Sequence, residues 1–387
     1  METARKIFRI VMTVIAALML LFSLGTVIPV IPVFGSVANF ITVGYMHLWL
    51  PLCAVMFFIS LILSGGWNSG NRLWKLNTFI TMISLLISGF LVVYVAFRLK
   101  MNKLDFVFRP KKADVSGVIT ETFTYTESER GPVDLNVYFV NDGETDKPVM
   151  VYIHGGGWVQ SDKTAHTYYS EVFAKNGYVV VSMDYDLSSE NLHLAGFTET
   201  QVAEAFGWVR DNISRFGGDA EDLFVTGGSA GASMALNISY RINSGELAAT
   251  ADGAPLPRIK AVSVNFPACS MEDMYRNKDL ILGKTAHRMT YSYTGCSPVE
   301  NPALYESLDP ITHATKQVPA TCIFYGTNDT LVPQEATAHL VRTLSNWDMP
   351  VWSVAIPYGN HMYDMVEGGF GSSAYLEASL RWFEEHR

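Results

Sequence analysis

The chain of 387 residues carries a formal net charge of −9, a hydrophobic share of 49% and a mean hydropathy of +0.17. This length leaves room for more than one domain, and the hydropathy is high for a protein that is soluble throughout. The acidic excess disfavours nucleic acid as a partner, because phosphate backbones bind basic surfaces.

The first quarter of the chain holds three long apolar segments, at about 10–33, 41–63 and 79–97. Each has the roughly 20 residues that a helix needs to cross a hydrocarbon core, and such helices tolerate proline. A cleaved signal peptide, buried core helices and an interfacial middle segment are the alternatives. The first run is too long for a signal peptide and the segments present no polar face, so we predict a membrane domain of three transmembrane helices over residues 1–98.

Basic residues give conflicting indications of which side of the membrane carries the rest of the chain. Cytoplasmic loops are enriched in Lys and Arg, and the first helix usually dominates the orientation. Five basic residues lie before the first span or between the second and third, against six just after the third. Following the first helix, we expect a multi-pass membrane protein whose C-terminal part is extracytoplasmic.

Charge divides the chain at about residue 112. Residues 1–112 hold 11 Lys and Arg against 2 Asp and Glu, a net charge of +9, whereas the remainder holds 17 against 35, a net charge of −18. We expect the basic part to lie beside anionic lipid headgroups, and the acidity of the remainder to favour solubility. Residues 99–117 are predicted to link the membrane domain to a C-terminal domain at 118–387.

Strand and helix patterns alternate after this linker. Residues 118–126 and 133–140 alternate apolar and polar side chains on either side of Gly131-Pro132, which predicts an antiparallel pair at a sheet edge. From Val149 onward the alternation predicts a mainly parallel sheet with helices on both faces. The later strands are expected at about 149–153, 178–183, 223–226, 259–264, 321–324 and 351–356, and the helices at about 167–175, 198–214, 232–242, 334–346 and 373–385.

Three glycines follow the first of these strands, in the run His154-Gly155-Gly156-Gly157-Trp158. Consecutive glycines leave backbone N–H groups unshielded by side chains, so these groups can donate to an oxygen that becomes negative during acyl transfer. A flexible loop with a structural histidine is the alternative. We treat Trp158 as a candidate contact for a bound substrate.

The run Gly227-Gly228-Ser229-Ala230-Gly231 matches G-x-S-x-G and lies between a predicted strand and a predicted helix. Small residues at Gly227 and Gly231 permit a turn sharp enough to expose the Ser229 hydroxyl. A serine held in such a nucleophile elbow attacks a carbonyl carbon when a base removes its proton. A plain glycine-rich turn is the alternative.

The segment from about 270 to 308 interrupts the alternation of strands and helices and is rich in Tyr, Met and Arg. We interpret it as a cap insertion over the active site that shapes the substrate pocket and excludes water. Candidate lining residues are Tyr291, Tyr293 and Met289. A surface excursion without substrate contact is the alternative.

An acid and a base follow the last two predicted strands, Asp329 after 321–324 and His361 after 351–356. Ligand-binding groups gather at this edge of open parallel sheets. With Ser229 they form the chain order Ser, Asp, His. This order predicts a catalytic triad in which Ser229 is the nucleophile, His361 the base and Asp329 the acid that orients it.

In combination, these motifs resemble the α/β-hydrolase superfamily from about Val118 to the C-terminus. The closest resemblance is to the hormone-sensitive-lipase-like carboxylesterases and the bacterial feruloyl and acetyl-xylan esterase-like domains. It implies an α/β-hydrolase fold and an oxyanion hole formed by the N–H groups of Gly156, Gly157 and Ala230. It also implies that His154 orders its loop and is not the base.

Two positions depart from the lipase-like pattern. Asp186 stands where those proteins often have arginine, and Ala232 stands where they have a further glycine after the elbow. Neither position belongs to the predicted triad. The departures put the substrate preferences of that subfamily in doubt for this chain.

The sequence thus predicts a membrane-anchored serine hydrolase with no cofactor and no metal, most simply a carboxylesterase that cleaves short acyl esters through an acyl-enzyme. An acyltransferase, an amidase or a peptidase would use the same triad, and a non-catalytic binding module on this scaffold is a further alternative. Small-molecule, glycan and lipid esters all remain open as substrates.

The four cysteines show no metal-ligand spacing. Cys53 and Cys322 lie in apolar runs and are expected to be buried hydrophobes. Cys269 and Cys296 flank most of the predicted cap and could pair in an oxidising compartment, a question that the sequence leaves open.

Overall fold

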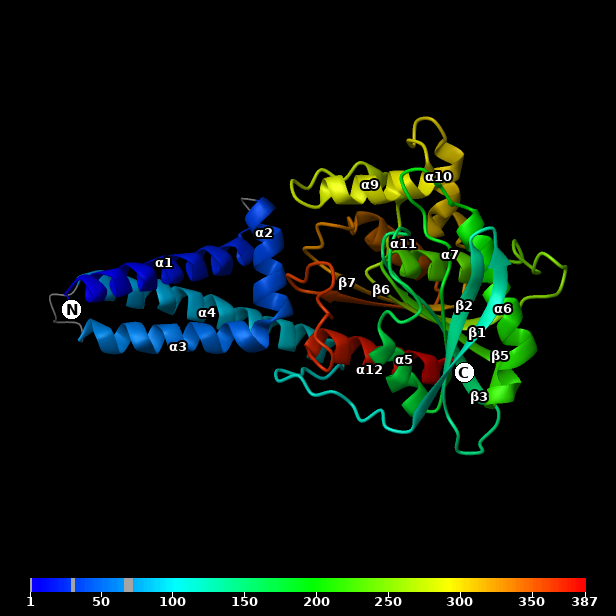
Figure 1. Ribbon diagram of the computed structural model, residues 1–387, viewed down its shortest axis with the longest axis horizontal. Helices are drawn as coiled ribbons and strands as arrows, with labels where there is room; N and C mark the ends of the chain where they lie inside the picture. Colours follow the sequence, from blue (N-terminus) through cyan, green and yellow to red (C-terminus); the bar gives the residue numbers. More distant parts are fainter. Residues whose placement is uncertain (1, 29–31, 66–71) are drawn as a thin grey trace. The chain divides into compact units, whose positions relative to one another are not determined.

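The computed structural model describes residues 2–28, 32–65 and 72–387 (Figure 1). The end of the first predicted span, at 29–31, lies outside these residues. Contacts divide the chain into two compact units. The first unit comprises Met1–Lys112, Gly326–Thr330 and Ile356–Ala374, and the second comprises Ala113–Tyr325, Leu331–Ala355 and Tyr375–Arg387.

Three helices of the first unit are long and apolar enough to cross a membrane, namely α1 (Glu2–Val27), α3 (Met46–Ser64) and α4 (Arg72–Met101). Between α1 and α3 lie α2 (Pro32–Asn39) and a π-helical turn, η1 (Phe40–Gly44). The first span was predicted to continue to residue 33, but α1 ends at Val27 because a residue that precedes proline disfavours the α conformation. At both ends, α4 extends beyond 79–97 through Leu, Lys and Arg residues that favour helix.

Small polar side chains lie between these helices, and large apolar ones lie outside. Asn77 of α4 donates from Nδ2 to Thr13 Oγ1 of α1 at 3.1 Å, and Ser88 of α4 is buried against α3. Leu86 and Val93 on the other side of α4 are 65% and 68% exposed. Small and polar contacts of this kind are typical of helices that associate in lipid.

Eight strands form one mostly parallel sheet in the order β1-β2-β4-β3-β5-β6-β7-β8. The antiparallel edge pair is confirmed, but the tight turn is Glu129-Arg130, and Gly131-Pro132 begins β2, where a proline at the start of a strand loses no ladder bond. The strands are β1 (Val118–Ser128), β2 (Gly131–Val140), β3 (Lys147–Ile153), β4 (Val179–Met183), β5 (Gly218–Gly228), β6 (Ile259–Asn265), β7 (Ala320–Gly326) and β8 (Val351–Ile356).

Helices cover both faces of the sheet, as predicted (Figure 1). Phe383 of α12 (Phe370–Glu385) lies 6.0 Å from Phe173 of α5 (Thr167–Lys175) and 4.8 Å from Phe224 of β5, between ring centroids. The opposite face is covered by α6 (Phe197–Asn212), α7 (Ala230–Ser244) and α11 (Glu335–Asn346). A 3₁₀ turn, η2 (Ile213–Phe216), follows α6.

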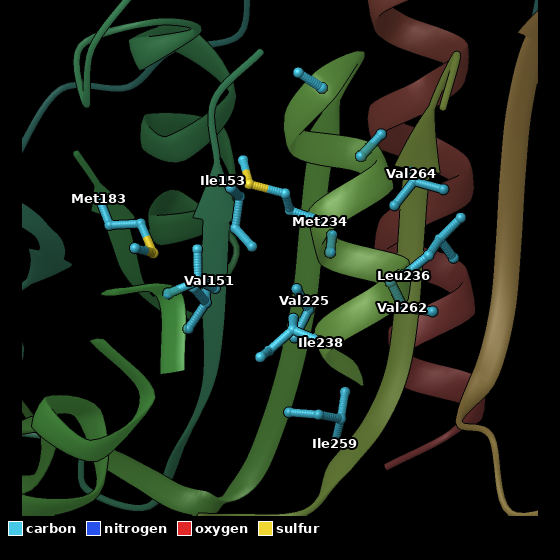
Figure 2. Packing of buried hydrophobic residues seen from close by; sticks show 14 of the residues in the cluster. Val151, Ile153, Met183, Val225, Met234, Leu236, Ile238, Ile259, Val262 and Val264 are labelled. Atoms are coloured by element: carbon cyan, nitrogen blue, oxygen red, sulfur yellow. The ribbon is translucent and has the colours of Figure 1, made fainter. Parts of the chain in front are cut away.

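The core between α7 and the sheet is built from branched aliphatic side chains (Figure 2). Val151, Val225 and Val262 come from three neighbouring parallel strands, and Met234 and Ile238 come from α7. Each is at most 3% exposed. Full burial of such a side chain contributes about 1.5–3 kcal/mol, so this layer fixes where the C-terminal ends of β3 and β5 lie.

The segment between β6 and β7 is helical. It forms α8 (Met271–Tyr275), α9 (Gly283–Thr294) and α10 (Pro302–Leu308), followed by a 3₁₀ turn, η3 (Pro310–His313). Asp309 joins the two ends of this segment, because its Oδ1 accepts a hydrogen bond from Met271 N at 2.7 Å. The interruption seen in the sequence is therefore an ordered helical insertion.

Candidate active site

Ser229 is the single residue between the end of β5 and the start of α7. Its backbone has φ 55 and ψ −123, a conformation that L residues with a β-carbon rarely adopt. Such strain costs about 1–3 kcal/mol and persists only where the surrounding structure determines it. The turn therefore has the geometry of the nucleophile elbow that the G-x-S-x-G motif predicts.

Two glycines make room for this turn. A Cβ atom on Gly231 would lie 2.1 Å from the carbonyl oxygen of Ile153, and one on Gly227 would lie 2.8 Å from the Gly231 carbonyl. Both obstacles are backbone, which cannot rotate away. The elbow is thus packed directly against the C-terminal end of β3, and only glycine fits at these positions.

The first of the three glycines after β3 lies against the elbow. A Cβ atom on Gly155 would lie 2.7 Å from Gly228 O and 3.2 Å from Ser229 Cβ. Gly156 and Gly157 have φ of +119 and +61, which leaves their peptide groups in orientations that other residues rarely reach. This glycine loop, residues 154–158, therefore contacts the elbow through Gly155, and the place of Gly156 and Gly157 in an oxyanion hole stays a prediction.

Ala230 is the first residue of α7. The first N–H groups of a helix have no partner within the helix, and they carry the positive end of its dipole. A negative oxygen held near Ser229 would meet this helix N-terminus. The sequence assignment of Ala230 to an oxyanion hole stays a prediction.

His154 is fully buried and belongs to the loop itself. Its Nδ1 lies 2.7 Å from Gly155 O, its ring stacks on Tyr185 with centroids 4.1 Å apart, and Tyr185 OH donates to the His154 carbonyl at 2.8 Å. Burial lowers the pKa of His154, so its ring is neutral at physiological pH. These contacts fit a residue that orders the loop.

Asp329 and His361 lie on the loops that follow β7 and β8, in the first unit. His361 Nδ1 lies 2.7 Å from Asp329 Oδ2, and the two side chains are 7% and 0% exposed. Because a carboxylate only accepts, Nδ1–H is the donor, and the lone pair of the neutral ring lies on Nε2. This is the tautomer that a general base oriented by an acid requires.

The loops that carry these two residues are joined to each other. Asn328 N donates to Gly359 O at 2.9 Å, and Tyr358 N donates to Thr327 Oγ1 at 2.9 Å. A Cβ atom on Gly326 would lie 2.2 Å from Gly359 O, so the backbones are in direct contact. The Asp329–His361 pair therefore rests on two interlocked loops.

Asn360 is a residue of this pair of loops that the motifs did not indicate. It is 5% exposed, and its Oδ1 accepts from Thr330 N at 3.3 Å and from His361 N at 2.7 Å. One amide oxygen thus fixes the backbone beside Asp329 and at His361. The only signal in the sequence is that asparagine tends to hydrogen-bond nearby backbone.

The aromatic residues proposed from the sequence to line a pocket lie in different environments. Trp158 and Tyr293 stack with centroids 4.7 Å apart and are 2% and 0% exposed, whereas Tyr291 is 43% exposed. A Cβ atom on Gly157 would lie 2.4 Å from Met289 Sδ, so α9 packs directly on the glycine loop. Contact of the three aromatic side chains with a substrate stays a prediction.

Glu199 supports this stack from α6. Tyr293 OH donates to Glu199 Oε1, and Gly196 N donates to Oε2 at 2.7 Å. Burial raises the pKa of Glu199 and, with the neighbouring Glu199 carboxyl, raises that of Tyr293 well above its ordinary value. In the sequence, Glu199 has only the signature of a helix-capping glutamate.

The cysteines and other metal-binding side chains form no cluster among the described residues. All four cysteines are free thiols, so Cys269 and Cys296 are not paired in the structure. Burial raises the pKa of Cys269 to about 12. Over residues 2–28, 32–65 and 72–387, no group of three His, Cys, Asp or Glu side chains is placed to hold a metal ion.

The matched family is BD-FAE, whose model covers residues 135–344, more than half of the chain. This range includes the glycine loop, the elbow and Asp329, and it ends before His361.

Curated relatives match the same part of the chain. Esterase LipQ and the probable carboxylic ester hydrolase LipM, both from Mycobacterium tuberculosis, are each 26% identical to it, over 226 and 239 residues. These matches cover 57% and 61% of this chain and 51% and 53% of the relatives. The chain therefore spans about half the length of the curated relatives that it matches.

Solved structures share the fold. Esterase B from Lactobacillus rhamnosis has a TM-score of 0.59 at 19% identity, covering 76% of this chain and 91% of that one. An esterase from Thermogutta terrifontis has a TM-score of 0.57 at 20% identity, covering 70% and 95%. With the family model, the sheet order and the elbow in agreement, this chain has the α/β-hydrolase fold and belongs to the BD-FAE family.

Proposed function

We propose that this protein is a membrane-anchored carboxylesterase that cleaves short acyl esters, with Ser229 as nucleophile, His361 as base and Asp329 as the orienting acid. The strained backbone of Ser229, at φ 55 and ψ −123, carries the proposal. Strain of this kind is retained where a side chain must be presented to a ligand. Curated relatives named as an esterase and a probable carboxylic ester hydrolase support the reaction class.

In the first half of the reaction, Ser229 Oγ attacks the ester carbonyl carbon while His361 Nε2 takes the hydroxyl proton. The bond to the alcohol oxygen then breaks, and His361 gives that proton to the leaving alcohol, which leaves an acyl-enzyme. In the second half, His361 takes a proton from water, the hydroxide attacks the acyl carbon, and the proton returns to Ser229 Oγ as the acid departs.

Two sets of groups stabilise the charge that develops. N–H groups of Gly156, Gly157 and Ala230 donate to the oxyanion of each tetrahedral intermediate, and one such donor is worth about 2.7–4 kcal/mol. Asp329 holds the His361 ring and stabilises its protonated form. The 2.7 Å hydrogen bond between Asp329 and His361 supports this last role.

A fluorophosphonate probe tests the nucleophile. The wild type should be labelled once, and Ser229→Ala should not be labelled. Ser233→Ala is the matched control, because Ser233 is the next serine on α7 and its hydroxyl donates to the Ser229 carbonyl at 3.3 Å. Labelling that survives Ser229→Ala would exclude this assignment.

For the membrane anchor, we propose that α1, α3 and α4 are transmembrane helices and that the catalytic part is extracytoplasmic. Large apolar side chains are exposed along all three helices, including Ile62 at 75% and Leu86 at 65%, and lipid solvates such surfaces. The basic residues before α1 support the orientation.

The size of the acyl group is proposed to be limited by the segment over the site. The helical segment α8–α10 is proposed to cap the site, which the packing of Met289 on Gly157 supports. With 4-nitrophenyl esters of increasing chain length, kcat/KM should be highest between acetyl and butyryl and fall about tenfold or more by octanoyl. A parallel assay on acetylated xylan and a 4-nitroanilide separates glycan esters and amides from simple esters.

A further inference from the structure

We propose that the end of α4 and the chain after it position the catalytic base, so that the membrane segment itself sets the geometry of His361. The inference rests on the proposed function, because it concerns the base of that reaction. It involves three stretches of the first unit: the end of α4, the juxtamembrane segment at residues 102–112, and the base loop at residues 356–370.

Aromatic rings join these stretches on both sides of His361. Tyr94 of α4 meets Tyr358 edge to face with centroids 6.2 Å apart, and Tyr358 lies three residues before His361. Phe106 of the juxtamembrane segment lies 6.2 Å from Phe370 at the start of α12. Each such pair contributes about 0.5–1.5 kcal/mol beyond its burial.

The backbone contact is closer still. Lys111 N donates to Gly368 O at 2.9 Å, and a Cβ atom on Gly368, whose φ is +69, would lie 2.4 Å from the Lys111 carbonyl carbon. Lys112 and Glu367 form an ion pair whose side chains are 65% and 42% exposed, so it contributes little. The rings and the backbone therefore carry the contact.

These contacts lie on both sides of His361 in the chain. Tyr358 holds the loop before His361, and Gly368 and Phe370 hold it afterwards. Tyr358 is also bonded to the loop of Asp329 through Thr327. A displacement of the end of α4 is therefore transmitted to both members of the Asp329–His361 pair, and a shift of about 1 Å in a catalytic group can cost 10²-fold in rate.

Tyr94 and Phe106 are thus positioning residues that act through His361. The test uses the full chain in detergent micelles, with the double variant Tyr94→Leu/Phe106→Leu. Its matched control is Phe58→Leu/Phe79→Leu, which removes two aromatic rings from α3 and from the start of α4 that are 56% and 52% exposed.

For 4-nitrophenyl acetate, the Tyr94/Phe106 variant should lose about 10- to 100-fold in kcat with KM changed by no more than about threefold. The acid limb of its kcat/KM profile, which reports the base of the free enzyme, should shift by about 0.5 pH unit or more. The Phe58/Phe79 control should keep wild-type values. Wild-type kcat in the Tyr94/Phe106 variant, or a loss that only matches its unfolded fraction, would overturn the proposal.

Amide exchange supplies a readout that does not need turnover. In a Ser229→Ala background, residues 356–370 should exchange about tenfold faster or more in the Tyr94/Phe106 variant than in the control. Unchanged exchange overturns the positioning contact even if the esterase assignment holds. Conversely, if the wild type shows no Ser229-dependent labelling, the proposed function fails while the exchange result still decides whether α4 holds the loop.

Discussion

At and beside the elbow, the residue with a strained backbone is not one of the residues whose small size makes room for the turn. Ser229 carries the unfavourable backbone dihedrals, while Gly155, Gly227 and Gly231 leave the space that the turn needs. With larger residues at these glycine positions the turn could not lie so close to β3, because their β-carbons would overlap main-chain oxygens.

Gly231→Ala and Gly245→Ala compare two causes of lost stability. The first variant introduces a steric overlap, and the second only places a β-carbon on a residue with positive φ. At Gly231 the new Cβ would lie 2.1 Å from a backbone oxygen, so we expect a loss of about 3 kcal/mol or more in the free energy of unfolding. Gly245 has φ +80 and open space around it, so its alanine variant should lose only about 1–2 kcal/mol. Urea unfolding followed by fluorescence measures both, and equal losses would contradict the packing argument.

Asp329→Asn should reduce kcat by about 10³–10⁴-fold with little change in fold, because an amide can hold the wrong His361 tautomer and cannot stabilise its charged form. Asp211→Asn is a suitable control, since Asp211 is 59% exposed and forms its ion pair with its chain neighbour Arg210. A loss below about tenfold for Asp329→Asn would mean that another group orients His361.

At the scale of elements, the helical insertion is attached to the rest of the fold through apolar packing and through polar contacts. α9 is held on α6 by the bond from Tyr293 to Glu199, and the insertion is closed by the bond from Met271 N to Asp309. Burial raises the pKa of Asp309 to about 7. The stability of this insertion should therefore depend on pH.

The sign of that dependence follows from proton binding. In the unfolded chain an aspartate has a pKa of about 3.9, so between about pH 4 and pH 7 the folded state binds more protons and stability falls as pH rises. Asp309→Asn keeps an acceptor for Met271 N without this titration. By urea unfolding, the variant should be about 2–4 kcal/mol more stable than the wild type at pH 8 and no more stable at pH 4. Equal pH slopes for the two proteins would contradict the assignment.

Elements with a strong local signal could be predicted from the sequence. A buried aliphatic run indicated β3, and the alternation of strand and helix patterns indicated β8 and α5, both of which have the bounds expected. Asn360, Glu199 and the contact of Met289 with Gly157 could not be predicted, because each depends on a partner brought near by the tertiary fold. The same is true of the juxtamembrane segment, whose composition resembles that of an ordinary linker.

At the scale of the whole molecule, composition and contacts divide the chain differently. Composition changes at about residue 112, whereas the contacts group Met1–Lys112 with the loops of Asp329 and His361. These loops thus belong to the same compact unit as the segment proposed to lie in the membrane. Its anchoring and orientation can be tested on the intact protein.

Alkaline carbonate should leave the protein in the membrane pellet, and detergent should release it, because three apolar helices resist extraction that removes peripheral proteins. Protease added to right-side-out vesicles should digest the part after residue 118 and spare an N-terminal tag. Digestion only in inverted vesicles would place the catalytic part on the cytoplasmic side.

The pairing of Phe106 with Phe370 also has a consequence for biosynthesis. About two thirds of the chain separates the two residues, and at about 5–20 residues per second a ribosome takes roughly 10–50 s to make that stretch. During this interval Tyr94 and Phe106 are already synthesised, but their ring partners Tyr358 and Phe370 are not. The proposed support of His361 therefore becomes complete only after Phe370 has been synthesised, long after Ser229 and the elbow.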